Sequence, residues 1–237
     1  MEGQPTATGR PPRQPKPVPP GSSATRFPDL LPSRERLDAL RRQHLDVAAL
    51  TVSVAEGRLF STDLLVMSMI QRSYGVVDAL IDAVDSYNIH AAAPLLRLQL
   101  DTLFRAHYAA SSNSDELTMR LLEGKEFRRM KDSEGRTLND GRLKDLAAAA
   151  HPWAPVVYNK TSGWVHLSLS HMLATVQVSG ESELFMGVPL QPHVIPQSLW
   201  QEIYGASMRA TEELFAYVRG WAARKGMPPG ELRELPH

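Results

Sequence analysis

Residues 90–107, His-Ala-Ala-Ala-Pro-Leu-Leu-Arg-Leu-Gln-Leu-Asp-Thr-Leu-Phe-Arg-Ala-His, decide the fold of this 237-residue chain. The stretch is apolar on almost every side of a helix, which is typical of a buried central helix. It nevertheless carries Arg97 and Asp101, which are one helical turn apart and can pair, and Asp101 has the same spacing to Arg105. We therefore predict an all-α bundle around this helix, with Arg97 and Asp101 largely buried in a stripe at its structural or functional centre.

The segments on either side also have helical periodicity and end signals. Pro94 is tolerable in the first turn of the central helix, so that helix should begin near Ala91. Between residues 175 and 187 the pattern changes, and it predicts a small β-hairpin or an irregular flap. The helices predicted from these patterns cover residues 33–54, 61–87, 91–110, 114–131, 139–150 and 196–225.

Composition bounds the organisation of the chain. Lys+Arg and Asp+Glu both number 26, so no global field favours nucleic acid or an anionic membrane. We predict a disordered, proline-rich tail over residues 1–32, one helical domain over 33–227 and a C-terminal tail over 228–237. There is no cysteine, no secretory signal and no uninterrupted transmembrane segment, so we expect a cytoplasmic protein that does not act at a membrane.

Two groups of polar residues lie on otherwise regular helices. His44 falls on the apolar stripe of the first helix, where a histidine is usually a hydrogen-bonded core residue rather than a ligand. Asp78, Asp82 and Asp85 share one face of the second helix and could hold a divalent cation, but a solvated acidic face is the better interpretation. We therefore predict no metal site and no cofactor.

The segment from Tyr158 to His171 brings together hydroxyls, aromatic rings and two histidines. In one hypothesis, Arg97, Asp101 and His166 are catalytic, with His166 as the general base and Arg97 stabilising a developing anion. Tyr158 and Ser162 would then contact the substrate. In the other hypothesis, which we favour, the same residues form a buried polar network that sets how the helices register.

These residues also carry a resemblance. Arg97 and Asp101, followed by Tyr158-x-x-x-Ser162-x-x-x-His166, resemble a family of prokaryotic helical proteins of unknown function. In that family a Leu-Arg helix with an acidic residue four positions later, more usually glutamate, precedes a Tyr-Ser-His segment. The family is in turn similar to HEPN-like bundles, whose catalytic members are RNases of toxin and phage-defence systems. Their motif, an Arg followed by four to six residues and then a His on one helix, is not matched by Arg97 or Arg105.

The sequence therefore supports a helical binding or regulatory module, and the resemblance places it in prokaryotic stress or defence. We expect a homo-oligomer that binds a protein partner or a small ligand. The alternative is a metal-independent, HEPN-like RNase or nucleotide-processing enzyme, for which RNA is the candidate partner.

Overall fold

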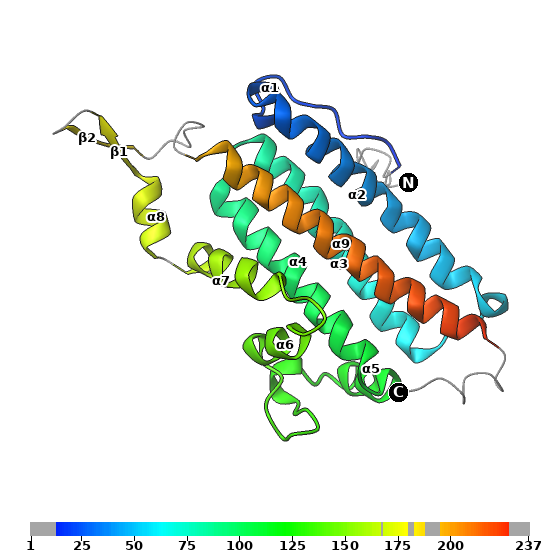
Figure 1. The fold of residues 1–237 in the computed structure, drawn as a ribbon. Coiled ribbons are helices and arrows are strands. Elements are labelled where there is room, and N and C mark those ends of the chain that lie inside the picture. Colours follow the sequence, from blue (N-terminus) through cyan, green and yellow to red (C-terminus); the bar gives the residue numbers. More distant parts are fainter. Residues whose placement is uncertain (1–12, 167, 180–182, 188–194, 228–237) are drawn as a thin grey trace, which may run out of the picture.

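The computed structural model describes residues 13–166, 168–179, 183–187 and 195–227. Four long helices lie side by side as a bundle (Figure 1), namely α2 (Leu31–Ser53), α3 (Ser61–Asp85), α4 (Ile89–Ala110) and α9 (Gln197–Gly226). The prediction of an all-α bundle is confirmed. The shorter helices are α1 (Ser23–Arg26), α5 (Ser114–Leu122), α6 (Asp140–Ala147), α7 (Ala154–Val165) and α8 (Leu169–Ala174), with single 3₁₀ turns at Pro28–Leu30, Ala55–Gly57 and Phe127–Arg129.

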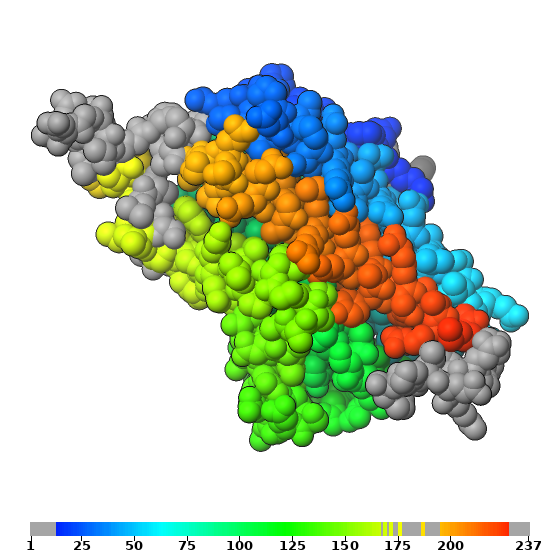
Figure 2. Space-filling view, viewed as in Figure 1, coloured from blue at the N-terminus to red at the C-terminus, as the bar shows by residue number. Residues whose placement is uncertain are grey.

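Helix α4 is the central element. It packs against α3 and α9 within the bundle and against α6 and α7 outside it. Its side chains Leu100, Leu103 and Phe104 are buried in one apolar cluster, and Leu96 is buried in a second cluster at the other end of the bundle. The side chain of Asn88 caps the helix by accepting from the N–H of Ala91 at 3.1 Å, so the helix begins at Ile89 rather than near Ala91 and Pro94 lies in its second turn rather than its first. In Figure 2, α9 forms a diagonal band between α2 and the segment that contains α6 and α7.

A chain of buried hydrogen bonds crosses all four long helices. His44 Nδ1 lies 2.9 Å from the carbonyl of Leu40, and its Nε2 lies 2.8 Å from the hydroxyl of Ser73. The amide of Gln99 donates to Ser73 at 2.7 Å and to Thr211 at 3.0 Å. The prediction that His44 is a hydrogen-bonded core residue is confirmed.

The N-terminal boundary differs from the prediction. Residues 13–32 are not a disordered tail, because 13–20 lie along the bundle, Ser23 begins a short helix and Leu30 is fully buried. The helical domain thus begins ten residues before residue 33. The rest of the predicted tail, 1–12, lies outside the described residues, as does the predicted C-terminal tail. Proline-rich composition misled here because long-range contacts hold the segment: polar contacts hold the backbone of residues 14–17, and Ala24 and Leu30 are buried in the core.

One further helix is shorter than predicted, and the segment predicted as a β-hairpin or a flap is a hairpin in its described part. The helix expected over 114–131 ends at Leu122, and Gly124 then adopts a left-handed backbone with φ of 83°. The described part of the flap forms a two-stranded antiparallel hairpin, β1 (Val176–Ser179) with β2 (Glu183–Met186), in which Val176 pairs with Met186.

Helix α3 is long and apolar enough to span a membrane by length and composition alone. Half of its most apolar window is buried inside the protein, as is common for the core helix of a soluble bundle.

Candidate functional site

Of the two ion pairs that the spacing of α4 allows, Asp101 forms the one with Arg105 and not the one with Arg97. Asp101 is buried, as expected, but it pairs with Arg105 one turn later and with Arg72 of α3, whose Nη2 lies 2.8 Å from its Oδ2. Arg97 does not pair with Asp101. Its guanidinium lies over the ring of Tyr158 instead, because α7 packs on this face of α4.

Arg97 therefore occupies an unusual environment. It is half-buried, and no carboxylate among the described residues lies within ion-pair distance of it. Desolvation lowers the pKa of Arg97, and burial raises the pKa of the Tyr158 phenol beneath it. A second cation, the ammonium of Lys144 on α6, lies 5.6 Å from the centre of the same ring.

Arg105 joins α4 to α6 beside these two cations. Its Nη2 lies 3.0 Å from Oδ1 of Asp140, the first residue of α6, while its Nη1 faces Asp101. We call the resulting group the α4 charge cluster, which comprises Arg72, Arg97, Asp101, Arg105, Asp140, Lys144 and Tyr158. It holds four cations and two carboxylates from three helices, and a fourth helix, α7, contributes the ring of Tyr158.

An apolar cavity of about 390 Å³ adjoins this cluster between α3, α4 and α5. Leu65, Met69 and Phe127 contribute apolar side chains to its walls, and Arg72 and Arg105 supply the charge. The guanidinium of Arg105 lies 5.2 Å from the ring centre of Phe127. A cavity of this size, apolar with a few converging polar groups, has the character of a small-molecule site.

The predicted site residues are only partly brought together. Arg97 and Tyr158 are in contact, and Asp101 lies one turn further along α4, in the cluster. His166 is exposed at the C-terminal end of α7, eight residues or about 12 Å of helix beyond Tyr158, and no contact joins it to Arg97 or Asp101. Ser162 is half-buried one turn beyond Tyr158 and makes no side-chain contact with the cluster.

Sequence reasoning missed Arg72, Asp140 and Lys144. Each lies on another helix, 29 to 43 residues from Asp101 in sequence, and no spacing signal links it to α4. It also missed a second polar group, in which the hydroxyl of Tyr217 on α9 lies 2.7 Å from Nδ1 of His107 and 2.8 Å from Nε2 of His151. Nδ1 of His151 in turn lies 2.5 Å from Oε2 of Glu213.

Tyr217 is the centre of this second group. A phenol has one proton, so it can donate to only one imidazole, and the other imidazole must donate to the phenol oxygen. Burial raises the pKa of Tyr217 and lowers the pKa of His107, so both groups favour their neutral forms. The arrangement ties the C-terminal end of α4 and the loop after α6 to α9.

Tyr217→Phe is expected to lower the free energy of unfolding by about 1–3 kcal/mol, because it leaves two partly buried imidazole nitrogens without a partner. Urea denaturation followed by circular dichroism measures the change. Tyr108→Phe is the matched control, since the Tyr108 hydroxyl makes no hydrogen bond to the described residues. Equal stability of the two variants would contradict the role given to Tyr217.

No family model, curated protein or solved structure matches this chain. The resemblance to a prokaryotic helical family and to HEPN-like bundles therefore stays a prediction.

Proposed function

We propose that the chain is a ligand-binding module for a small organic anion with an apolar body. The apolar body would occupy the cavity between α3, α4 and α5, and the anionic group would face Arg72 and Arg105. The observation that carries the proposal is this combination of a cavity of about 390 Å³ with two arginines in its wall.

The charge balance of the site supports an anion. The α4 charge cluster holds four cations but only two carboxylates, of which Asp101 is shared between Arg72 and Arg105 and Asp140 pairs with Arg105. An arginine has five N–H donors, and the one ion pair of Arg72 leaves others to bind a carboxylate or phosphate. Arg97 extends the positive charge along α4 because it has no carboxylate partner there.

The mouth of the cavity favours an apolar ligand body. Leu64 and Leu122 line the cavity and are each more than half exposed, so an entering apolar group would cover them. Burying such surface stabilises a complex by roughly 25 cal/mol per Å². The site therefore suits a ligand that is apolar at one end and charged at the other, and such a ligand could regulate how the bundle meets a partner.

The alternative RNase or nucleotide-processing activity has less support. It requires a general base within hydrogen-bond reach of the reacting group, and His166 is about two turns of helix from the Arg97–Tyr158 contact. Arg97 remains a candidate for contacting a phosphate. No observation supplies the base.

Octanoate tests the proposal, with 1-octanol as its uncharged match. We expect octanoate to raise the melting temperature more than octanol does at equal concentration, because only octanoate can pair with Arg72 and Arg105. Arg72→Leu and Arg105→Leu are each expected to weaken octanoate binding about tenfold or more, as a charge-assisted hydrogen bond is worth about 1.5–3 kcal/mol. Isothermal titration measures the affinities.

Arg128→Leu is the matched control, because Arg128 is exposed, pairs with Glu126 and lies outside the cavity. Its octanoate affinity should equal that of the wild type. Equal binding of octanoate and octanol, or unchanged affinity in both arginine variants, would contradict the proposal. Binding of a single-stranded RNA that octanoate does not displace would favour the RNase hypothesis instead.

A further inference from the structure

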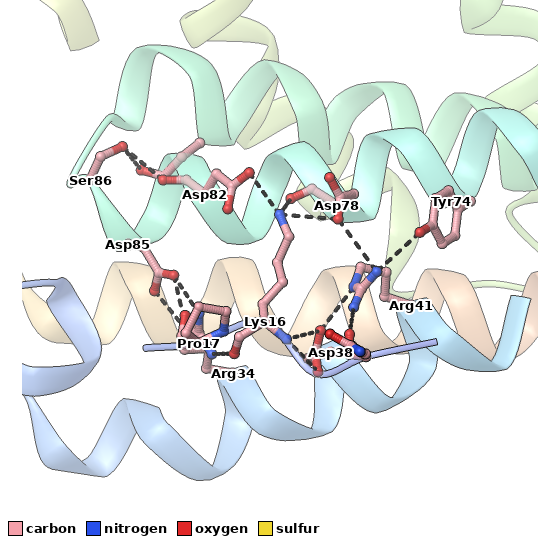
Figure 3. Close-up of polar contacts among 12 residues, drawn as sticks. Lys16, Pro17, Arg34, Asp38, Arg41, Tyr74, Asp78, Asp82, Asp85 and Ser86 are labelled. Atoms are coloured by element: carbon pink, nitrogen blue, oxygen red, sulfur yellow. Dashed lines mark hydrogen bonds and ion pairs between the residues drawn. The ribbon is translucent and has the colours of Figure 1, made fainter. Parts of the chain in front are cut away.

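Residues 13–20, Arg-Gln-Pro-Lys-Pro-Val-Pro-Pro, lie without helix or strand across the groove between α2 and α3. We call this segment the strap (Figure 3). Most of its side chains are exposed, so it contributes little to the apolar core. Lys16 and Val18 are less exposed, and the side chain of Lys16, only 9% exposed, enters the groove.

The groove binds Lys16 through an acidic site on α3. Its ammonium lies 2.7 Å from Oδ2 of Asp82, 3.1 Å from Oδ1 of Asp78 and 2.7 Å from the carbonyl of Asp78. These three oxygens match the three donors of a primary ammonium. Asp78 and Asp82 therefore bind Lys16 and are not simply the solvated acidic face that their spacing predicted. The described residues contain no group of acidic or histidine side chains suited to a metal ion.

The groove also binds the backbone of the strap. Arg41 Nη2 donates to the carbonyl of Gln14 at 2.6 Å, and Arg34 donates to the carbonyls of Lys16 at 3.3 Å and Pro17 at 2.8 Å. The N–H of Lys16 lies 3.3 Å from both carboxylate oxygens of Asp38. The groove thus donates hydrogen bonds to three carbonyls of the strap and accepts one from its backbone N–H at Lys16.

This pattern fits a proline-rich peptide in particular. Proline has no N–H, so a segment with alternating prolines presents mainly carbonyl acceptors, and its extended form costs little entropy to fix. The two arginines supply the matching donors, and each is pre-positioned by a buried carboxylate, Arg34 by Asp85 and Arg41 by Asp38. All four of these charged side chains are at least 95% buried.

We propose that the α2–α3 groove is a recognition site for a peptide with a lysine flanked by prolines. The strap occupies this site in cis, and a segment of the same chemistry in another protein can occupy it by displacing the strap. The contacts are to backbone carbonyls and one ammonium, so they do not depend on the strap being part of the same chain. The strap ends at a turn where Gly21 has φ of 72°, and Ser23 beyond it is fully buried. It can therefore leave the groove without unfolding α1.

The test uses full-length protein and a fluorescein-labelled peptide of residues 13–20, with binding followed by anisotropy. In the wild type, the strap competes at a high effective concentration, on the order of millimolar, so we expect weak binding. Lys16→Ala removes the ammonium contacts of the strap and is expected to bind the peptide about tenfold or more tightly than the wild type does. Lys125→Ala is the control, because Lys125 is exposed and, within the part of the chain that the structure describes, its ammonium pairs with Glu123 alone.

Two further changes test the chemistry of recognition. We expect the gain in peptide affinity of Lys16→Ala to be lost when Asp78→Asn and Asp82→Asn are added to it. We expect the same loss when the lysine of the peptide is replaced by alanine. The proposal is overturned if Lys16→Ala binds no better than the wild type, or if the alanine peptide binds as well as the lysine peptide. It is also overturned if Lys16→Ala does not fold and about 1 mM peptide fails to restore its helical signal, because the strap would then be a permanent part of the fold.

Discussion

Asp85→Ala is expected to lower the free energy of unfolding by about 3–5 kcal/mol, because it leaves the guanidinium of Arg34 buried without its counter-ion. Arg34 Nε lies 2.8 Å from Oδ1 of Asp85 and Nη2 lies 2.7 Å from Oδ2, in a bidentate pair. The two side chains are only 2% and 4% exposed, so water cannot replace the missing partner. Urea denaturation at neutral pH measures the loss.

The exposed pair of Arg13 with Asp46 provides the control for Asp85→Ala. Asp46→Ala is expected to change stability by about 1 kcal/mol or less, since surface ion pairs contribute little. The double variant Arg34→Met with Asp85→Leu should be more stable than Asp85→Ala, because it leaves no unpaired charge. If Asp85→Ala lowers the free energy of unfolding by less than about 1 kcal/mol, the buried pair stabilises the protein no more than a surface pair does.

The second large effect is a loss of stability as the pH falls from about 6.5 to about 4. Burial lowers the pKa of His44 from 6.5 to about 4 in the folded protein, although the carbonyls of Leu40 and Arg41 oppose that shift. In this pH range the unfolded chain binds a proton at His44 and the folded chain does not. Falling pH therefore favours the unfolded chain, and the cost from this one group reaches about 3 kcal/mol near pH 4.

The structure gives the reason for this resistance to protonation. With Nδ1–H donating to Leu40, Nε2 must accept the hydroxyl proton of Ser73, whose oxygen accepts from Gln99. A proton on Nε2 would face that hydroxyl proton and break the chain of hydrogen bonds to α4 and α9.

Urea denaturation at several pH values tests this expectation by comparing the wild type with His44→Gln. The variant should show a shallower fall in stability between pH 6.5 and pH 4, by up to about 1.4 kcal/mol per pH unit. In the wild type, the nuclear magnetic resonance signals of the His44 ring should remain those of a neutral imidazole down to about pH 5. Identical pH slopes in the two proteins would contradict the assignment.

The sequence predicted the features that depend on local spacing. The apolar run from His90 to His107 was sufficient to predict the central helix, and the stripe through His44 was sufficient to predict a core histidine. Both follow from a period of 3.6 residues, which any helix imposes on its own side chains whatever packs against it. Arg97 and Asp101 were identified for the same reason, as charged groups on a helix that is otherwise apolar, whereas Tyr158 was identified from the crowding of hydroxyls, aromatic rings and histidines in its segment.

Only the tertiary structure decided which charges pair. Asp101 could reach Arg97 or Arg105 by spacing alone. It pairs with Arg105 and also with Arg72, because α3 brings a second guanidinium to this face. The guanidinium of Arg97 lies over the ring of Tyr158 instead. The strap depended on long-range contacts in the same way. Its prolines favour an extended chain, but the carboxylates and arginines that bind it are 17 to 66 residues away in sequence. Local sequence sets helices and their faces, whereas the choice among ion-pair partners depends on distances of a few ångströms between helices, which exist only after the bundle has packed.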